Sequence, residues 1–481
     1  MKDSDIKMMK YFLKSFLVIL LTAACASVQL IHGQTYINVE ARRRTSNADG
    51  TISYKPYEPF RTRTVESLAG FKPKKPTALS KYGGRTEKRV SPTGFFRVEK
   101  IDNRWWCIDP EGYLYFNVAL NSISMGGSDR NKQALKNKFG TPEHWITETI
   151  KMLQENGFNC AGSWSDHKAI IGANSKSDEP FAYTINLNFM SSYGRERGGT
   201  FQQPGHTGYP GDAIFVFDPG WESFCDKHAK QAAVYKDDPN LFGYFSDNEM
   251  PFRFKSLDNY LALPEKDPGH IAAAKWMEDQ GISKEQISDR HRELFLAEVA
   301  DRYFSAVSKA LRKYDPNHMY IGARFYSSEK NYPEFMKTAG KYLDIISNNY
   351  YNKWTPDSAD MANWTKWSGR PFIITEYYTK GEDSGMPNQS GAGWIVKTQK
   401  DRGLFYQNYN LALLESKNCV GWHYFKYQDN DPTETGVDPS NTDSNKGIVN
   451  NIYELWTPMM ELMKELNTRV YDIIDYFDKH D

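Results

Sequence analysis

The sequence has little cysteine, no excess of either charge and none of the glycine-rich motifs of nucleotide-binding proteins. Five cysteines occur among 481 residues, and none forms a C-x-x-C pair, which argues against a zinc site. Lysine plus arginine and aspartate plus glutamate both number 60, so the net field does not favour nucleic acid. No G-x-G-x-x-G or P-loop segment is present. We therefore predict no metal, no cofactor and no nucleic-acid partner.

The sequence has one long apolar run, at the N-terminus, and lacks a second. Lys7 and Lys10 precede the run 12–26, which is too short and too N-terminal for a permanent membrane span. We predict that residues 1–33 are a signal peptide and that a bacterium exports the protein to the periplasm, the outer membrane or the outside. The sequence LTAAC at 21–25 is the alternative, a lipoprotein box that would leave a lipid anchor on Cys25.

The rest of the chain divides by composition. Residues 34–92 are polar and rich in arginine, lysine, threonine and serine, so we interpret them as an N-terminal extension or linker. Within them, FKPKKP at 71–76 is typical of a linker or of a strap over a larger domain. Residues 93–475 suffice for one large domain. Aromatic residues make up 14% of the chain, and such rings serve both in cores and as stacking platforms for sugars.

From residue 93 onward, apolar strand-like runs alternate with amphipathic helical patterns. Residues 95–107 and 113–120 flank a turn with Pro and Gly, which predicts a β-hairpin whose second arm could continue as a first barrel strand. Apolar residues at helical spacing predict helices over 141–156, 221–236 and 287–314. Further strands are predicted over 158–164, 181–187, 241–245, 319–322, 342–347, 371–375 and 420–425.

This alternation of strands and helices indicates a parallel sheet. We predict an α/β fold, a (β/α)8 TIM barrel over residues 93–475 with a short N-terminal extension and a β-hairpin leading into the barrel. An open doubly wound sheet is the competing arrangement. A glycine-rich strand-to-helix turn would favour it, and the sequence has none.

Two predicted strands end in a glutamate. The run 241–245 leads through Ser, Asp and Asn into Glu249, and the run 371–375 leads directly into Glu376. Catalytic side chains of a barrel project from the carboxyl ends of its strands, and a buried carboxylate is costly unless it is paired or used. Each glutamate alone could be paired with a neighbouring strand, for example through Arg324. Two carboxylates, on strands four and seven, instead suit cleavage of a glycosidic bond.

These segments resemble known enzymes. The sequence GYFSDNE at 243–249 resembles the Asn-Glu signature of clan A glycoside hydrolases, and IITE at 373–376 resembles the nucleophile strand of that clan. More narrowly, the chain resembles family 50 β-agarases and their relatives. The segments that carry this narrower resemblance are WWCIDPEG at 105–112, VFDP at 216–219, FSDNE at 245–249 and GEDSGM at 381–386.

The resemblance implies distinct roles for the two glutamates. Glu249 would be the general acid/base, and Glu376 would be the nucleophile. Since a nucleophile has to be ionised, we expect its surroundings to lower the pKa of Glu376. Asn248 would bind the 2-hydroxyl of the sugar at the cleaved subsite. Retention of configuration would follow if the carboxyl groups lie about 5–5.5 Å apart, whereas a wider gap admits a water and gives inversion.

Further substrate-binding residues are predicted with a structural alternative open for each. Trp422, on the last strand, would be the floor on which the sugar stacks, or a core residue. Tyr350 or Tyr351 could hold the nucleophile in place. Trp164 could line the cleft or belong to the core.

Many clan members carry an arginine at the end of strand two, where this chain reads GSWSDH at 162–167. The second positive partner of the nucleophile is therefore missing from its usual place. Arg324 or His423 could replace it, and His423 could instead be a buried structural residue.

We therefore expect a retaining β-glycoside hydrolase that acts by double displacement. The resemblance implies a galactose-containing polysaccharide or its oligosaccharides, of the agarose or porphyran type, as substrate. Two alternatives stay open: a clan A hydrolase of another β-glycan, such as a β-galactoside, mannan or glucan, and a barrel that binds glycan without catalysis. The presence of both glutamates argues against the second alternative.

Overall fold

The computed structural model describes residues 35–47, 50–73 and 77–480. The predicted signal peptide at 1–33 and the alternative lipid anchor at Cys25 lie outside these residues, as does part of the FKPKKP segment. Within the described ranges, none of the helices has the length and the apolar character that crossing a bilayer requires.

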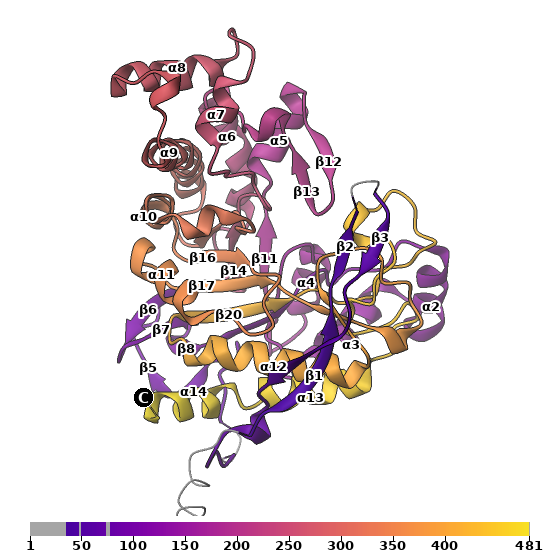
Figure 1. Cartoon of the computed structure of the whole chain (residues 1–481). Coiled ribbons are helices and arrows are strands. Elements are labelled where there is room, and N and C mark those ends of the chain that lie inside the picture. Colours follow the sequence, from indigo (N-terminus) through magenta and orange to yellow (C-terminus); the bar gives the residue numbers. More distant parts are fainter. Residues whose placement is uncertain (1–34, 48–49, 74–76, 481) are drawn as a thin grey trace, which may run out of the picture.

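Parallel strands form a barrel at the centre of the molecule (Figure 1). The eight-stranded sheet has the order β15-β14-β11-β10-β9-β20-β17-β16. A parallel bridge from Phe325 to Asn348 joins its two ends, so the sheet closes on itself. In chain order the strands are β9 (Asn117–Leu120), β10 (Cys160–Ala161), β11 (Ala182–Asn186), β14 (Leu241–Phe245), β15 (Met319–Gly322), β16 (Ile346–Asn349), β17 (Phe372–Glu376) and β20 (Cys419–Tyr424). The predicted TIM barrel is confirmed.

Side chains fill the inside of the barrel. The buried apolar residues that contact one another there include Ala119, Cys160, Ala182, Phe242, Phe245, Met319, Ile321, Ile345, Ile373 and Val420. Tyr82, Phe96, Cys107 and Tyr115 belong to the same cluster, and most of them come from or flank a four-stranded antiparallel sheet. That sheet therefore closes the N-terminal end of the barrel, and the opposite end is left for chemistry.

The antiparallel sheet corrects one expectation and confirms another. Its strands are β5 (Arg85–Arg89), β6 (Arg97–Ile101), β7 (Arg104–Ile108) and β8 (Tyr113–Tyr115). We expected residues 95–107 to be one arm of a hairpin, but they form β6 and β7, which pair with each other. Asp102 and Asn103 make the turn with φ of 48° and 65°, a conformation that Asp and Asn tolerate. The second predicted arm does continue into the first barrel strand.

Helices surround the barrel (Figure 1). They are α2 (Asp129–Phe139), α3 (Pro142–Glu155), α4 (His167–Asn174), α5 (Phe189–Arg197), α6 (Trp221–Ala229), α7 (Ser256–Leu261), α8 (Pro268–Gln280), α9 (Asp289–Tyr314), α10 (Pro333–Tyr342), α11 (Ser358–Ser368), α12 (Gln399–Glu415), α13 (Thr457–Asn467) and α14 (Val470–Lys479). The helix predicted over 287–314 is α9, which begins at a capping box formed by Ser288 and His291. The strand predicted over 342–347 begins later, at Ile346, because Tyr342 still belongs to α10.

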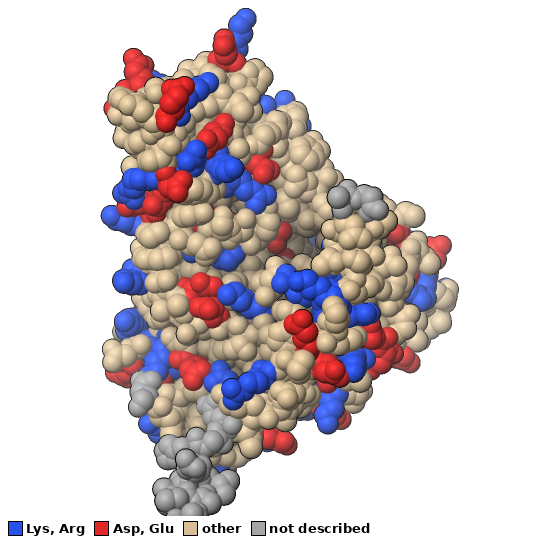
Figure 2. Space-filling model, in the orientation of Figure 1, with Lys and Arg blue, Asp and Glu red and all other residues tan. Residues whose placement is uncertain are grey.

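Additional strands surround the mouth of the barrel at the carboxyl ends of its strands. The hairpin of β12 (Phe201–Gln203) and β13 (His206–Gly208) lies between β11 and β14 in the chain, and β2 (Arg44–Ser46) pairs with β3 (Ile52–Tyr54). Figure 2 shows that the surface is hollowed between the positions that these two hairpins have in Figure 1, and acidic atoms are visible in the hollow.

The N-terminal segment pairs with the segment that follows Glu376. Strand β1 (Ile37–Arg42) lies antiparallel to both β4 (Glu58–Thr62) and β19 (Trp394–Val396). In turn, β19 pairs with β18 (Thr379–Gly381), which begins three residues after Glu376. Val39 and Ala41 of β1 are buried in the main core. The N-terminal strands thus support one wall of the barrel mouth.

Candidate active site

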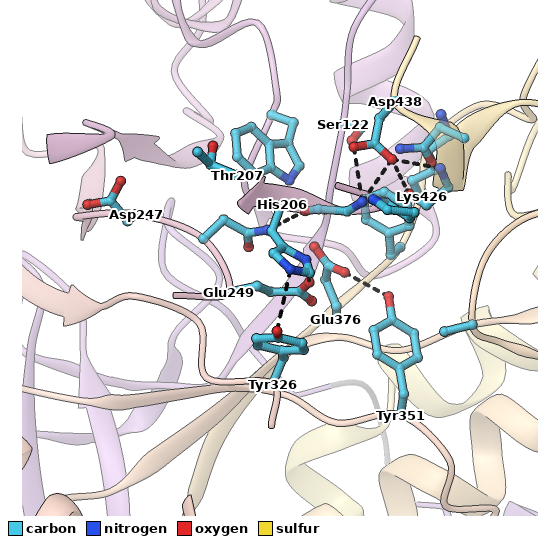
Figure 3. Close-up of a pocket in the computed structure, with 18 of the residues that line it drawn as sticks. Ser122, His206, Thr207, Asp247, Glu249, Tyr326, Tyr351, Glu376, Lys426 and Asp438 are labelled. Atoms are coloured by element: carbon cyan, nitrogen blue, oxygen red, sulfur yellow. Dashed lines mark hydrogen bonds and ion pairs between the residues drawn. The ribbon is translucent and has the colours of Figure 1, made fainter. Parts of the chain in front are cut away.

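A cavity of about 560 Å³ lies at the carboxyl ends of the barrel strands. Glu249, just after β14, and Glu376, at the end of β17, both line it. Figure 3 shows the two carboxylates near the centre of this pocket. Further lining residues are Ser122, Trp164, Gly205, His206, Asp247, Asn248, Tyr326, Tyr351, Tyr378, Phe425, Lys426, Asp438 and Lys446.

Both oxygens of Glu376 are held by donors. The guanidinium group of Arg324 donates to Oε1 in a buried ion pair, and the hydroxyl of Tyr351 donates to Oε2 over 2.7 Å. The residue is 7% exposed. A carboxylate fixed at both oxygens has one orientation, which suits a group that must face a reacting carbon.

Glu249 has different partners. The amide of Asn349 donates to its Oε1 over 2.8 Å, and Nδ1 of His206 lies 3.5 Å from its Oε2. The hydroxyl of Tyr326 lies 3.4 Å from Nε2 of the same imidazole, so that His206 stands between Glu249 and Tyr326 (Figure 3). One oxygen of Glu249 is thus held by an amide, and the other faces a titratable group within reach of proton exchange.

Several residues of the site have a left-handed backbone, among them one of the two glutamates. Trp164, Glu249 and Arg324 have φ of 65°, 50° and 54°. Each follows the carboxyl end of a barrel strand, where the chain turns sharply. This conformation is unfavourable for residues with a Cβ, and such strain is found at functional sites.

Arg324 connects four groups around the cavity. Its Nε donates to Oδ1 of Asn248 over 2.8 Å, and one terminal nitrogen donates to the carbonyl of Thr375 over 3.2 Å. The guanidinium also donates to Glu376 and to Oγ of Ser163. Ser163 follows strand two of the barrel, so Arg324 reaches from strand five to the place where the sequence lacks an arginine.

The pKa of Glu376 departs from expectation. We expected a lowered value, but burial raises the pKa of this carboxyl, and the negative charge of Glu249 acts in the same direction. The charge of Arg324 and the hydrogen bonds of Arg324 and Tyr351 oppose this effect without overcoming it. The prediction of a lowered pKa is therefore wrong for the free cleft, because desolvation dominates.

His423 does not contact the nucleophile candidate. It is fully buried, and its Nε2 lies 2.9 Å from Oδ1 of Asn117. Burial and the neighbouring charge of Arg324 both lower the pKa of His423, so it is not a cation here. Of the two predicted positive partners, the structure places Arg324 against Glu376, and the prediction for His423 is wrong.

Trp422 is not the floor of the cavity. Its side chain is 0% exposed, and its indole N–H donates to the hydroxyl of Tyr406 on α12 over 2.8 Å. The prediction of a stacking platform is wrong because β20 contains a bulge. Phe372 of β17 pairs with Cys419 of β20, and Ile374 pairs with Trp422. β20 therefore has one residue more than β17 between these two pairs. The extra residue turns Trp422 away from the barrel interior.

Two other predicted contacts are resolved by the structure. Trp164 is 41% exposed and lines the cavity, so of its two interpretations the cleft is the one observed. Tyr350 points away from the cavity, and its hydroxyl donates to Asp360 over 2.5 Å. Tyr351 is the tyrosine that holds Glu376, and the choice of Tyr350 is wrong.

Asn248 and the hairpin tip form a second set of contacts above Glu249. The amide of Asn248 donates to the carbonyl of Gly205 over 2.9 Å. The backbone N–H of Gly205 donates to the carboxylate of Asp438 at 2.9 and 3.0 Å. The tip of the β12–β13 hairpin is therefore held between the strand-four side and the strand-eight side of the mouth.

Asp247 caps a helix. Its carboxylate accepts from the backbone N–H groups of Met190 and Ser191 in the first turn of α5, at 2.7 and 3.0 Å. The hydroxyl of Tyr303 donates to it as well, over 2.7 Å. Asp247 thus caps a helix that precedes it in the chain.

Sequence reasoning missed several residues of the site. Asn349, whose amide holds Glu249, ends the buried strand β16, and a polar side chain at that place was a signal that could have identified it. Tyr326, Lys426 and Lys446 lie in irregular segments, where no periodic pattern marks them. His206 lies in the short hairpin of β12 and β13, where no periodic pattern marks it either.

Comparisons with known proteins agree with this geometry. No family model matches the chain. Beta-agarase B of Vibrio sp. (strain JT0107) is 25% identical over 81% of this chain and 50% of its own length. Beta-agarase A of the same organism is 24% identical over 82% of this chain and 48% of its own length. The chain thus spans about half the length of the curated relatives it matches.

Solved structures extend the comparison. The structure of the agarase AgWH50C has the same fold, with a TM-score of 0.67 and 24% sequence identity. The match covers 83% of this chain and 67% of the AgWH50C chain. The crystal structure of BpGH50 covers 92% of this chain and 96% of that chain, with 33% identity and a TM-score of 0.80. Because this similarity extends over nearly the whole of both chains, the protein belongs to glycoside hydrolase family 50.

Proposed function

We propose that this protein hydrolyses β-linked galactans of the agarose or porphyran type, or their oligosaccharides, with retention of configuration. The observation that carries the proposal is the placement of Glu249 and Glu376 in one cavity at the ends of β14 and β17. Two carboxylates with different partners can divide the work of proton transfer and attack.

In the first step, Glu376 attacks the anomeric carbon and Glu249 protonates the leaving oxygen. Arg324 and Tyr351 keep Glu376 aimed, since each holds one of its oxygens. In the second step, Glu249 takes a proton from water, and the water displaces Glu376 from the sugar. The mechanism requires a separation of about 5–5.5 Å between the carboxyl groups.

The contacts of Glu249 support its role as the proton donor and acceptor. Asn349 holds Oε1, which leaves Oε2, beside His206, as the oxygen that exchanges protons. Asn248 lines the same cavity, and its amide is already oriented by Arg324 and Gly205. A fixed amide beside the acid/base suits recognition of a sugar hydroxyl.

The relatives supply the choice of substrate. Two curated relatives are named beta-agarases, and one solved structure of the same fold is described as an agarase. This supports a galactan in preference to a mannan or a glucan.

An activity screen tests the proposal. Agarose, porphyran, mannan and aryl β-glycosides are incubated with the wild-type protein and with Glu376→Ala, and the anomeric configuration of the first product is followed by proton NMR. We expect galactan cleavage with a β-configured first product, reduced on the order of 10⁴-fold in the variant. Cleavage of mannan or glucan alone would contradict the galactan substrate. An α-configured first product would contradict retention of configuration. No cleavage at all would favour a barrel that binds glycan without catalysis.

A further inference from the structure

Two lysines line the catalytic cavity without a carboxylate partner. Lys426 follows β20, and Lys446 lies in the segment between β20 and α13. Both ammonium groups lie against the same aromatic ring, that of Phe425, with Nζ at 6.0 Å and 5.5 Å from its centre. Among the described residues, neither lysine forms an ion pair. Like charges gathered on one wall of a partly buried cavity repel each other unless an anion joins them.

The two lysines differ in how their N–H groups are used. Lys446 donates to the carbonyl of Ser440 and to Oδ1 of Asn441, so its ammonium group is fixed in the wall. Lys426 has no hydrogen-bond acceptor for its ammonium group within the described part of the chain. Figure 3 shows Lys426 on the Asp438 side of Glu376, in the interior of the pocket. Lys426 is half-buried, and a partly desolvated ammonium group without a partner is stabilised when an anionic ligand binds to it.

The acidic groups nearby are already engaged. The carboxylate of Asp438 accepts from Gly205, from Gln202 and from Ser440. Asp429 accepts from the amide of Asn445, from the backbone N–H of Gly447 and from the indole of Trp456.

Burial lowers the pKa of Lys426 to about 8, and Asp429 and Glu434 act on it in the opposite direction. Lys426 is therefore mostly charged at neutral pH. Burial and repulsion from Lys426 and Lys380 lower the pKa of Lys446. An anion bound between Lys426 and Lys446 would stabilise the charged form of both.

We propose that Lys426 and Lys446 form a subsite for an oxyanion substituent, a sulfate ester or a carboxylate, on a sugar unit bound beside Glu376. The proposal rests on the proposed function, because it assigns part of the glycan to the same cavity. It makes the substrate an anionic galactan, whereas neutral agarose leaves both ammonium groups without an anionic partner.

The cavity has room for such a substituent. A second cavity of about 240 Å³ adjoins the catalytic one, and the two share Ser122, Lys426, Asp438 and Asn441 in their linings. Lys426 thus stands where the two spaces meet. A sugar unit in the catalytic cavity can direct an oxyanion toward Lys426 while its ring remains beside the two glutamates.

The first measurement needs no glycan. Inorganic sulfate is titrated into the full chain by calorimetry at constant ionic strength, against chloride, in two buffers of different ionisation enthalpy. We expect saturable sulfate binding with proton uptake, retained in Lys426→Arg and weakened about tenfold in Lys426→Met. Lys275→Met, which changes an exposed lysine on α8 paired with Asp279, is the matched control and should bind as the wild type does.

The second measurement uses three oligosaccharides of one galactan backbone: neutral, 6-sulfated, and oxidised at C6 to the uronate. The readout is the ratio of kcat/KM for each anionic form to that for the neutral form. We expect a ratio above one for the sulfate or the uronate form, which identifies the source of the oxyanion. This ratio should fall about tenfold in Lys426→Met and stay in Lys426→Arg. It should also decline as the pH rises through about 8, where Lys426 loses its charge beside Asp429, Glu434 and Lys446.

The outcomes separate the two proposals. The subsite is refuted if the neutral form is cleaved with the same kcat/KM as both anionic forms, or if Lys426→Met leaves the ratio unchanged. In either case the proposed galactan hydrolysis is unaffected. If no galactan is cleaved, the proposed function fails, and the sulfate titration alone decides the subsite. Sulfate binding that Lys426→Met does not weaken would overturn the subsite in that case.

Discussion

The two tyrosines that follow β16, Tyr350 and Tyr351, donate to carboxylates in different places. The hydroxyl of Tyr351 donates to Glu376, whereas that of Tyr350 donates to Asp360 on α11. We expect Tyr351→Phe to lower kcat about 10- to 100-fold, because a hydrogen bond to a charged group is lost at the nucleophile. Tyr350→Phe should keep kcat and lower the free energy of unfolding by about 1 kcal/mol. Steady-state kinetics and urea unfolding of both variants check this, and equal kinetic losses would contradict it.

The acid side of the pH–rate profile depends on Arg324. Glu376 must be ionised to attack, so activity is lost as the pH falls through its pKa. Arg324→Gln removes the charge that opposes the raised pKa of Glu376, so the acid limb of kcat/KM should move to higher pH. Arg104→Gln is the matched control, because Arg104 is equally buried and pairs with Asp478 outside the cavity. It should lower stability and leave the acid limb in place; a shift in both variants would count against this account.

The site could be predicted from the sequence only where a side chain terminates a regular strand. Glu249 and Glu376 follow apolar runs that have to be buried, so their positions at the barrel mouth could be deduced. Trp422 could not be placed, because counting alternate residues from Val420 puts it inside the barrel. The bulge in β20 reverses that alternation, and the local sequence contains no feature that predicts the bulge. His206 comes from a short hairpin and Lys426 from an irregular segment, and both reach the site through tertiary contacts alone.

At the scale of elements, the β12–β13 hairpin is coupled to Glu249 through its tip. Gly205 has φ of +90°, and a Cβ there would lie 3.3 Å from Oε2 of Glu249. Gly205→Ala should therefore lower kcat/KM about tenfold, by straining the tip and crowding the acid/base. Gly198→Ala has nearly the same φ, +89°, with no atom within 4 Å. It should cost stability alone, so a similar loss of activity in both variants would show that strain, not crowding, matters.

Most elements could be predicted because their patterns are periodic. The helix α9 has an apolar face along its whole length and a capping box at its start, and its prediction is accurate to two residues. The region 95–107 failed because its turn, Asp102 and Asn103, contains neither glycine nor proline. The polar N-terminal strands were interpreted as an extension or linker, since their pairing with β19 is a contact between residues more than 350 positions apart.

At the scale of the whole molecule, the N-terminal segment supports the wall of the barrel mouth that follows Glu376 in the chain. Removing residues up to 62 takes away β1 and β4, which contribute buried Val39 and a hydrogen bond from Trp354 to Thr62. We expect the free energy of unfolding to fall by at least about 3 kcal/mol, since each buried apolar side chain contributes about 1.5–3 kcal/mol. Activity should fall as well, because β19 and β18 lose their support.

Thermal unfolding and kinetics of the truncated chain test this expectation. A chain that begins at residue 35 is the control, since it retains every described residue. Equal melting temperatures for the two chains would mean that the strands add nothing to the barrel.

Glu249 has a left-handed backbone, which lowers the stability of the fold, at a position where the proposed mechanism needs a carboxylate. Any residue with a Cβ is disfavoured at φ of 50°, by about 1 kcal/mol relative to glycine. Glu249→Gly should therefore unfold at a higher temperature than Glu249→Ala, although both are inactive; an equal melting temperature would deny any strain there. If the proposed function holds, stability alone would favour the loss of this glutamate, and a chain selected only for its stability would remain a folded barrel without activity.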